Sequence, residues 1–371
     1  MGAYFADHAS YEGDAMWMEE IARVQKSHPD NLMARFFDPA YYETLPLAHQ
    51  RRLEQIVATG WQNPDSIMGA YAMHPDDYDL FRPYLDKLIR AYHHIEGEMN
   101  QVTDWDLGGA QDLRAIDPDL SDVSMRVRVG RNVTDFPLPG AMTRADRVAL
   151  EGRMVEVFEH LAAADGFGGG YVSLTPGSPH EISSTRYEEL VAQHRMFKDM
   201  SGDKYLSVAG ISADWPHGRG MYQSEDGGFI VWVGEEDHLR VMAMERGAVL
   251  GHVFERLRAG LGLLTSQGLT FARSPSYGYV TSCPTNLGTG MRASLHLPLP
   301  RLTHNGTDVQ ALKPRCKDLG LSVRGAGGEH TAAGEGGIVD ISPSARLMVT
   351  EGEIARRLYE GVKALWAEER G

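Results

Sequence analysis

Residues 228–244 read GFIVWVGEEDHLRVMAM, and this stretch decides the fold. Two segments rich in β-branched, aromatic and other apolar residues, 228–233 and 238–244, flank the polar turn Gly234-Glu235-Glu236-Asp237. Short apolar runs on either side of a glycine-containing turn are typical of an antiparallel hairpin. We therefore predict an antiparallel sheet that carries three carboxylates at the end of one of its hairpins.

The same strand-like pattern recurs after residue 120 and alternates with helical segments. We predict strands at 123–129, 277–282 and 293–299, and helices at 144–164, 187–200 and 246–264. Nearer the N-terminus, apolar residues recur at helical spacing over 41–58 and 76–94. The sequence thus predicts an α+β protein: a small all-helical N-terminal domain over 1–110, then a larger domain over 111–371 with an antiparallel β-sheet flanked by helices.

The composition excludes several classes of partner. The 371-residue chain carries a formal net charge of −15, so its average field repels nucleic acids and anionic membranes. No apolar run approaches the roughly 18 residues of a membrane-spanning helix, and the N-terminus lacks a secretion signal. Two cysteines are too few for a disulfide framework. We expect a soluble cytoplasmic protein.

The common nucleotide and metal motifs are absent from the sequence. There is no G-x-x-x-x-G-K-[ST] P-loop and no protein-kinase signature set. Neither C-x-x-C nor H-E-x-x-H occurs, so we predict no metal site built from protein ligands alone. The glycine-rich stretch 166–170 fits neither phosphate-binding template, and a loop before a strand is the better interpretation.

The predicted strand 123–129 carries two arginines, Arg126 and Arg128. Side chains two positions apart on a strand leave the same face of the sheet. Two adjacent guanidinium groups are costly unless an anion lies between them, and a triphosphate is the natural candidate. The alternative is a solvated edge of the sheet.

The acidic turn and one cysteine add further candidates. Glu236 lies in the turn, with Arg240 on the strand that follows, although three acids in a turn also serve solubility alone. Cys283 ends a predicted strand, where Ser282 and nearby arginines would favour its thiolate. The alternative for Cys283 is a small core residue.

Two glycine-containing loops complete the set. The first delivers Arg292, and the second, which its glycines allow to move, holds Arg324 and Glu329. Together these stretches supply arginines, carboxylates and a cysteine. Phosphoryl transfer to a cationic acceptor requires such an inventory, because cations neutralise the phosphate oxygens while carboxylates align the acceptor nitrogen.

Three strings of this sequence resemble one enzyme family. They are Asp214-Trp215-Pro216-His217-Gly218-Arg219-Gly220, Glu235-Glu236-Asp237-His238-Leu239-Arg240 and Cys283-Pro284-Thr285-Asn286-Leu287-Gly288. Over nearly its whole length the chain resembles the phosphagen kinases, such as arginine kinase and creatine kinase. The resemblance implies reversible transfer of the γ-phosphoryl group of ATP to a small guanidino acceptor, in cytoplasmic energy buffering.

The resemblance also implies roles for individual residues. The residues that match the family's nucleotide-binding positions are Arg126, Arg128, His194, Arg240, Arg292, His296, Arg324 and Asp340. Those that match its catalytic positions are Glu236, Glu329, Cys283, Arg240 and Arg292. The nucleotide is expected to carry Mg²⁺, held mainly by its phosphates and by water.

Two further matches concern the acceptor. Glu329 resembles arginine kinases, in which a second carboxylate holds the guanidinium, and residues 66–71 resemble the loop that those enzymes close over the substrate. The resemblance implies that the substrate-binding residues are Ser66, Ile67, Met68, Tyr71, Glu236, Cys283 and Glu329. Arginine kinases commonly have glycine where Ile67 stands, and its bulk could crowd the backbone of arginine. L-arginine is therefore the expected acceptor, with taurocyamine or a similar compound as the alternative.

Two rival functions are open at this point. A bacterial protein-arginine kinase shares the catalytic domain, but a substrate loop in residues 1–110 would obstruct a polypeptide. A catalytically silent paralogue would bind nucleotide or guanidine as a sensor, although it has no chemical need for the intact charged set. The partners expected are the nucleotide and a small guanidino substrate, in a monomer or a homodimer.

Overall fold

The computed structural model describes residues 11–325 and 334–371. Its N-terminal part is helical, as predicted. The helices are α1 (Tyr11–Ser27), α2 (Leu32–Phe36), α3 (Pro39–Thr44), α4 (Leu47–Gln62), α5 (Asp77–Leu80) and α6 (Arg82–His93). The helix predicted at 41–58 is interrupted at Leu45 and Pro46, because proline has no N–H to continue the ladder. The helix predicted at 76–94 likewise divides at Phe81, just before Pro83.

Within the described residues, the rest of the chain builds an eight-stranded sheet in the order β2-β3-β4-β5-β1-β8-β10-β9, with antiparallel neighbours throughout. Its strands are β1 (Val123–Arg131), β2 (Gly170–Ser173), β3 (Gly220–Gln223), β4 (Phe229–Val233), β5 (Leu239–Gly247), β8 (Met291–Pro298), β9 (Leu321–Gly325) and β10 (Ile338–Pro343). The predicted α+β class is confirmed. The boundary predicted at residue 110 stays a prediction.

Six helices accompany the sheet in the described part of the chain. They are α7 (Arg144–Ala162), α8 (Ser184–Ala192), α9 (Lys204–Val208), α10 (Leu250–Ser266), α11 (Leu312–Asp318) and α12 (Glu351–Arg370). Capping boxes begin the two longest: Thr143 with Asp146 starts α7, and Thr350 with Glu353 starts α12. Short 3₁₀ turns occur at Leu113–Ala115, Pro118–Leu120, Pro139–Ala141, Pro284–Asn286 and Glu335–Gly337. Among the described residues, no helix combines the length and apolarity needed to cross a bilayer.

The hairpin that decided the fold is present. β4 and β5 pair with Val233 opposite Leu239, and Gly234 opens the turn with φ of 74°, which glycine adopts without strain. The strand predicted at 277–282 is wrong in length. It shrinks to β7 (Gly278–Tyr279), paired with β6 (Arg273–Ser274), because residues 275–277 form the turn of this two-residue hairpin.

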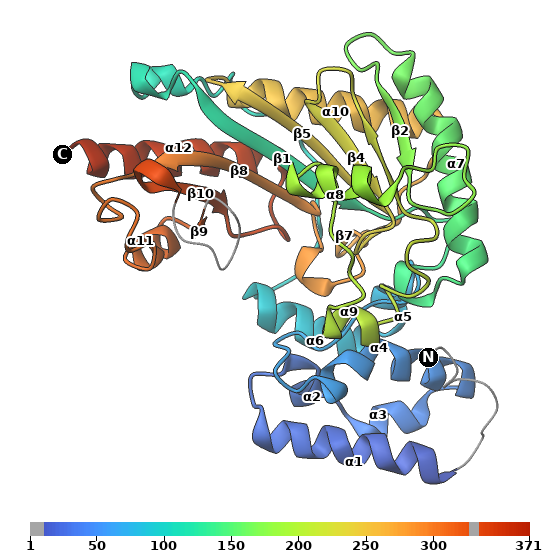
Figure 1. The fold of residues 1–371 in the computed structure, drawn as a ribbon. Coiled ribbons are helices and arrows are strands. Elements are labelled where there is room, and N and C mark those ends of the chain that lie inside the picture. Colours follow the sequence, from blue (N-terminus) through green and yellow to red (C-terminus); the bar gives the residue numbers. More distant parts are fainter. Residues whose placement is uncertain (1–10, 326–333) are drawn as a thin grey trace.

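One face of the sheet is predominantly apolar. Helices α7, α10 and α12 cover it, and Figure 1 shows α10 and α12 running along that side. Odd-numbered strand positions such as Val127, Val241 and Leu295 lie here with 0% exposure. On the opposite face, Met196 and its neighbours near α8 cover only the β3–β5 end. The strands β1, β8, β10 and β9 are thus left with an uncovered polar face.

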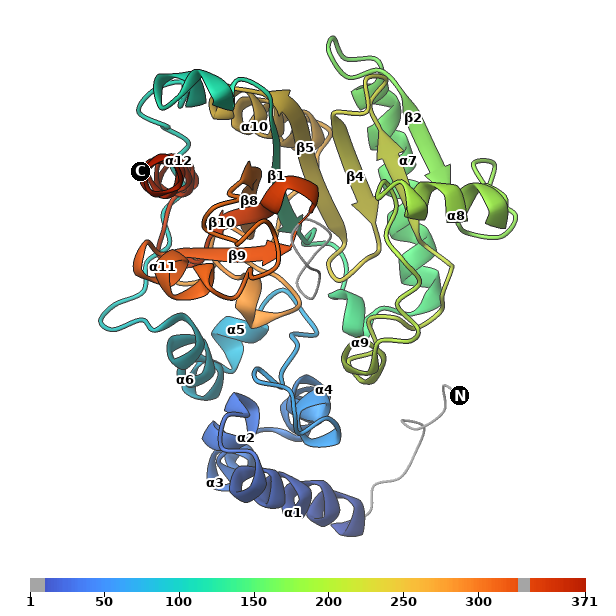
Figure 2. The ribbon, with the colours of Figure 1, turned by 60° about the vertical axis from the view of Figure 1, so that its left-hand side comes forward.

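The N-terminal helices form a lobe beside the sheet, drawn in blue in Figure 2. Hydrogen bonds join this lobe to the strand-end segment before Cys283: the hydroxyl of Tyr78 donates to the Thr281 carbonyl at 2.8 Å, and the Ala72 N–H donates to the Ser282 carbonyl at 2.8 Å. The ring of His93 contacts the Pro284 carbonyl at 2.9 Å. The position of Cys283 is therefore set by both parts of the chain.

Candidate active site

The predicted basic residues converge on the uncovered face of the sheet. Arg128 of β1 lies opposite Arg292 of β8, and on the other side of β1 Gly130 lies opposite Arg240 of β5. Asp340 of β10 lies opposite both His296 and Arg324, on β8 and β9. Because cross-strand partners share a face, strand register alone gathers side chains from four strands and Asp340 from a fifth.

A cavity of about 620 Å³ opens on this face. It is lined by seven of the eight residues expected at the nucleotide: Arg126, Arg128, His194, Arg292, His296, Arg324 and Asp340. The eighth, Arg240, lies just outside it. His194 reaches the cavity from the segment after α8, where its backbone takes the left-handed conformation with φ of 56°.

A second cavity, of about 380 Å³, adjoins the first. Arg128, Arg292 and Arg324 line both cavities, so the two share a wall of guanidinium groups. The other residues of the second cavity are Tyr71, Tyr92, Gly130, Glu236, Asp237, Arg240, Cys283, Thr285, Asn286, Gly290 and Arg346. Glu236 and Cys283, which are 47 positions apart in the sequence, therefore lie in one cavity.

Burial and neighbouring like charges make the guanidinium groups of this face costly to keep charged. Burial and then Arg292 lower the pKa of Arg126, and burial and then Arg240 lower the pKa of Arg128 well below its ordinary value. Asp340 pairs with Arg292 at 2.5 Å, and Arg240 pairs with Glu235 at 2.8 Å. A lowered guanidinium pKa means that the charged form is disfavoured where it stands. A bound polyanion would remove that penalty.

The acidic turn presents Glu236 to the second cavity. Burial, then repulsion by Asp237, raises the pKa of Glu236 to about 7, and Arg240, 3.7 Å away, opposes the shift. Burial also raises the pKa of Asp237, although Oδ1 of Asp237 accepts hydrogen bonds of 2.7 Å from the Ser282 N–H and from the Asn132 amide. Asp237 thereby ties the turn to the segment that carries Cys283.

In this structure burial acts against the predicted Cys283 thiolate, because it shifts the pKa of the thiol upward. Burial, followed by the charge of Glu236, raises the pKa of the Cys283 thiol to about 12. The sulfur lies 3.1 Å from the hydroxyl of Thr285, and the hydroxyl of Ser282 has no hydrogen-bond partner among the described atoms. Cys283 and Glu236 line the same cavity, so the charge of that acid opposes ionisation of the thiol.

The loop at 66–71 contributes unequally. Tyr71 lines the second cavity, whereas Ile67 has 61% exposure and Met68 packs into the N-terminal core with 6% exposure. The hydroxyl of Ser66 accepts the Gly69 N–H at 3.0 Å and so shapes the loop. The substrate roles of Ser66, Ile67 and Met68 stay predictions. Glu329 lies outside the described residues.

Comparison with known proteins decides the family. The profile of the ATP:guanido phosphotransferase C-terminal catalytic domain matches residues 150–371, and the profile of the ATP:guanido phosphotransferase N-terminal domain matches residues 27–90. The chain belongs to the ATP:guanido phosphotransferases. It is therefore an enzyme that uses ATP to phosphorylate a guanidino compound, as the three sequence strings indicated.

Relatives of this phosphotransferase differ in their named acceptors. It is 36% identical over 316 residues to a probable arginine kinase of Caenorhabditis elegans, covering 84% of each chain, and 37% identical over 321 residues to an arginine kinase of Amphioctopus fangsiao, covering 85% and 87%. A duplicated taurocyamine kinase of Schistosoma mansoni, solved with transition-state analogue components, superposes with a TM-score of 0.81 at 30% identity. The superposition covers 98% of this chain and 49% of the taurocyamine kinase chain. A lombricine kinase gives 0.80 at 28% identity, covering 91% and 92%.

The phosphotransferase cavity also contains residues that sequence reasoning missed. Tyr92 of α6 and Arg346 of the loop after β10 both line the second cavity, and the Arg346 guanidinium donates to the side-chain oxygen of Asn286. Tyr92 belongs to an amphipathic helix and Arg346 to no periodic segment, so neither carries a local signal. Asn286 lies three residues after Cys283 in one of the segments that resemble the family, and this proximity is the signal that could have identified it.

Proposed function

We propose that this enzyme transfers the γ-phosphoryl group of ATP reversibly to L-arginine, giving phosphoarginine and ADP. One observation carries the proposal: two adjoining cavities share Arg128, Arg292 and Arg324. The larger cavity has the cationic lining that a triphosphate needs, and the smaller one holds Glu236 and Cys283. A phosphoryl group at the shared wall would face its donor on one side and its acceptor on the other.

In this mechanism the arginines supply most of the catalysis by neutralising charge on the transferred group. The bond between phosphorus and the β–γ bridging oxygen breaks as the acceptor nitrogen bonds to phosphorus. The carboxylate of Glu236 orients the guanidinium and accepts the proton that this nitrogen loses. Its pKa of about 7 suits a group that must take the proton in one direction and return it in the other.

The nucleotide is proposed to bind with Mg²⁺, which would neutralise and orient the phosphate oxygens. The lining fits an ion held mainly by the phosphates and water. Asp340 is already paired with Arg292, and across residues 11–325 and 334–371 no three or more His, Cys, Asp or Glu side chains are placed to share a metal ion.

L-arginine is favoured as the acceptor by the arginine kinases among the relatives and by Tyr71 in the acceptor cavity. Glu329 is proposed as the second carboxylate at the guanidinium. Taurocyamine is the second candidate, because Ile67 stands where arginine kinases commonly have glycine, and because a taurocyamine kinase is among the solved relatives.

Coupled ATP turnover with Mg²⁺ tests the proposal on arginine, taurocyamine, creatine, glycocyamine and lombricine. We expect the highest kcat/KM with arginine. Ile67→Gly is the matched variant, which should raise kcat/KM for arginine if the isoleucine crowds its backbone and leave the value unchanged otherwise. Turnover of taurocyamine alone would establish the second candidate, and silence on all five acceptors would contradict both.

A further inference from the structure

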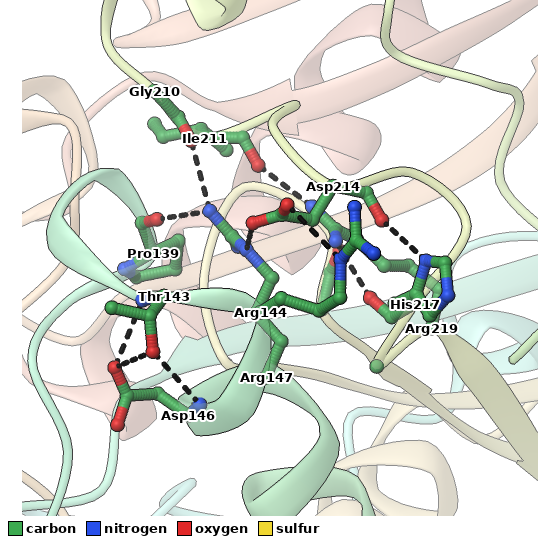
Figure 3. A network of polar contacts seen from close by, with 12 residues as sticks. Pro139, Thr143, Arg144, Asp146, Arg147, Gly210, Ile211, Asp214, His217 and Arg219 are labelled. Atoms are coloured by element: carbon green, nitrogen blue, oxygen red, sulfur yellow. Dashed lines mark hydrogen bonds and ion pairs between the residues drawn. The ribbon is translucent and has the colours of Figure 1, made fainter. Parts of the chain in front are cut away.

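A buried arginine lies behind the acidic turn, outside both cavities. Arg219, the last charged residue of the Asp214-to-Gly220 string, has 0% exposure. Its guanidinium donates to three backbone carbonyls: Nη2 to Ile211 at 2.9 Å, Nη1 to His217 at 2.7 Å and Nε to Gly234 at 3.1 Å. Figure 3 shows Arg219 beside Ile211 and His217 in this network.

Gly234 is the first residue of the turn that carries Glu236. A Cβ on Gly234 would lie 2.5 Å from the Gly218 carbonyl oxygen. The backbone at Gly218, the residue before Arg219, therefore packs directly against the backbone at Gly234. At the far end of the turn, Asp237 is held by Asn132 and the Ser282 N–H. Glu236 therefore lies between two anchors, of which Arg219 is one.

We propose that Arg219 is a positioning residue for phosphoryl transfer: it holds the Gly234 carbonyl and thereby fixes the Glu236 carboxylate in the acceptor cavity. This rests on the role proposed above for Glu236. Misplacing a reacting group by about 1 Å can cost roughly 100-fold in rate, so an anchor outside the cavity can control turnover.

The chemistry of the anchor favours arginine over other side chains. A planar guanidinium directs donors along several fixed directions, which matches carbonyls from the loop 211–217 and from the turn at Gly234, whereas an ammonium group on a flexible stem does not. Burial lowers the pKa of Arg219 to about 9, so the fold accepts an energetic cost to keep this charge inside. Packing alone would be served better by an apolar side chain.

Arg147 of α7 offers a matched control in the same network. It is also buried, with 3% exposure, and its Nη2 donates to the carbonyls of Pro139 at 2.8 Å and Gly210 at 2.9 Å (Figure 3). It also pairs with Asp214 at 3.6 Å. None of these partners belongs to the turn at 234–237. Arg147 thus shares the burial and bonding of Arg219 without its contact to Gly234.

The test compares Arg219→Lys and Arg147→Lys by kcat, acceptor KM, ADP affinity and Tm. Both variants should lose thermal stability. Arg219→Lys should also lose about 10–100-fold in kcat with unchanged ADP affinity, while Arg147→Lys keeps the wild-type kcat at temperatures below its transition. Arg219→Gln, which retains an N–H donor, replaces the lysine variant if that protein does not fold. Wild-type kcat in Arg219→Lys, or equal kcat losses in both lysine variants, would overturn the proposal.

A double-mutant cycle separates positioning from general damage. If Arg219 acts through Glu236, Arg219→Lys should add little to the kcat loss of Glu236→Gln. Full multiplication of the two losses would overturn the inference. The wild-type enzyme in the same assay distinguishes failure of the proposed function from failure of this inference. A wild type with no activity on any acceptor would contradict both. An active wild type with an equally active Arg219→Lys variant would contradict the inference alone.

Discussion

The two faces of the eight-stranded sheet differ in almost every property, although the same strands build both. Along β8, Ala293 and Leu295 are buried against the helices, while Arg292, Ser294 and His296 line the larger cavity. Figure 1 shows the helices α10 and α12 on the first side only. Because successive side chains of a strand point to opposite faces, one residue packs in the core while its neighbours on either side line the site.

The apolar face stabilises the fold, whereas the clustered charges of the basic face destabilise it. The apolar face removes large side chains from water, which stabilises the fold by about 25 cal/mol per Å² of apolar surface. The basic face holds guanidinium groups close together, and burial beside like charges lowers the pKa of Arg126 and Arg128. The stable face therefore supports an arrangement that is complete only when an anion is bound.

The largest effect expected on the basic side is that of Glu236→Gln. An amide cannot accept the proton from the acceptor nitrogen, so kcat should fall by about 10³-fold. Affinity for ADP should change little, because the nucleotide cavity does not include this residue. Steady-state kinetics together with ADP titration check both parts. A variant that turns over at the wild-type rate would remove Glu236 from the chemistry.

Arg292→Ala should have the next largest effect. The change removes a cation from the wall shared by the two cavities and leaves Asp340 without its 2.5 Å partner. We expect kcat to fall by about 10²-fold, with weaker ADP binding, because charge on the transferred phosphoryl group is no longer neutralised. Single-turnover measurements at saturating nucleotide distinguish the rate effect from the binding effect. Normal rates and affinity together would place Arg292 outside the site.

Leu295→Ala removes a core side chain from the apolar face of the same strand. Leu295 has 0% exposure in the core beneath α10 and α12, so the cavity left by alanine should cost about 3 kcal/mol of unfolding free energy. The kcat per folded molecule should be unchanged, since the side chain points away from Ser294 and His296. Urea unfolding and active-site titration measure the two quantities. A large loss of kcat in the folded variant would show that the faces are not independent.

The sequence predicts well which side chains of one strand share a face of the sheet, and poorly which side chains of different strands become neighbours. The alternation around Arg126 and Arg128 places both on one face, and the register confirms it. No local pattern, however, tells that Arg128 will stand opposite Arg292, because strand order depends on packing across the whole domain. The neighbours of β1 are β5 and β8, both distant in the chain.

Residues that act through neighbours are the hardest to predict. Tyr92 and Arg346 reach the acceptor cavity from a helix and an irregular loop, where burial and direction depend on tertiary contacts. Cys283 shows the same limit for electrostatics. Nearby arginines suggested a lowered pKa, but burial and the charge of Glu236 prevail and raise it. Which neighbour dominates a titration is a matter of distance, and distance follows from the fold.

The last predicted effect, which appears only at higher pH, concerns the stability contributed by Glu236. Its pKa rises from 4.5 to about 7 on folding, because the site is buried and Asp237 lies beside it. Between those values the folded state binds more protons than the unfolded state, so stability falls as pH rises, by at most about 3 kcal/mol. Below pH 4.5 both states are protonated and the penalty vanishes. Ligand-free Glu236→Gln should therefore have a higher Tm than wild type at pH 8 and a nearly equal Tm at pH 4. An equal Tm difference at the two pH values would show that ionisation of Glu236 does not lower the stability of the folded state.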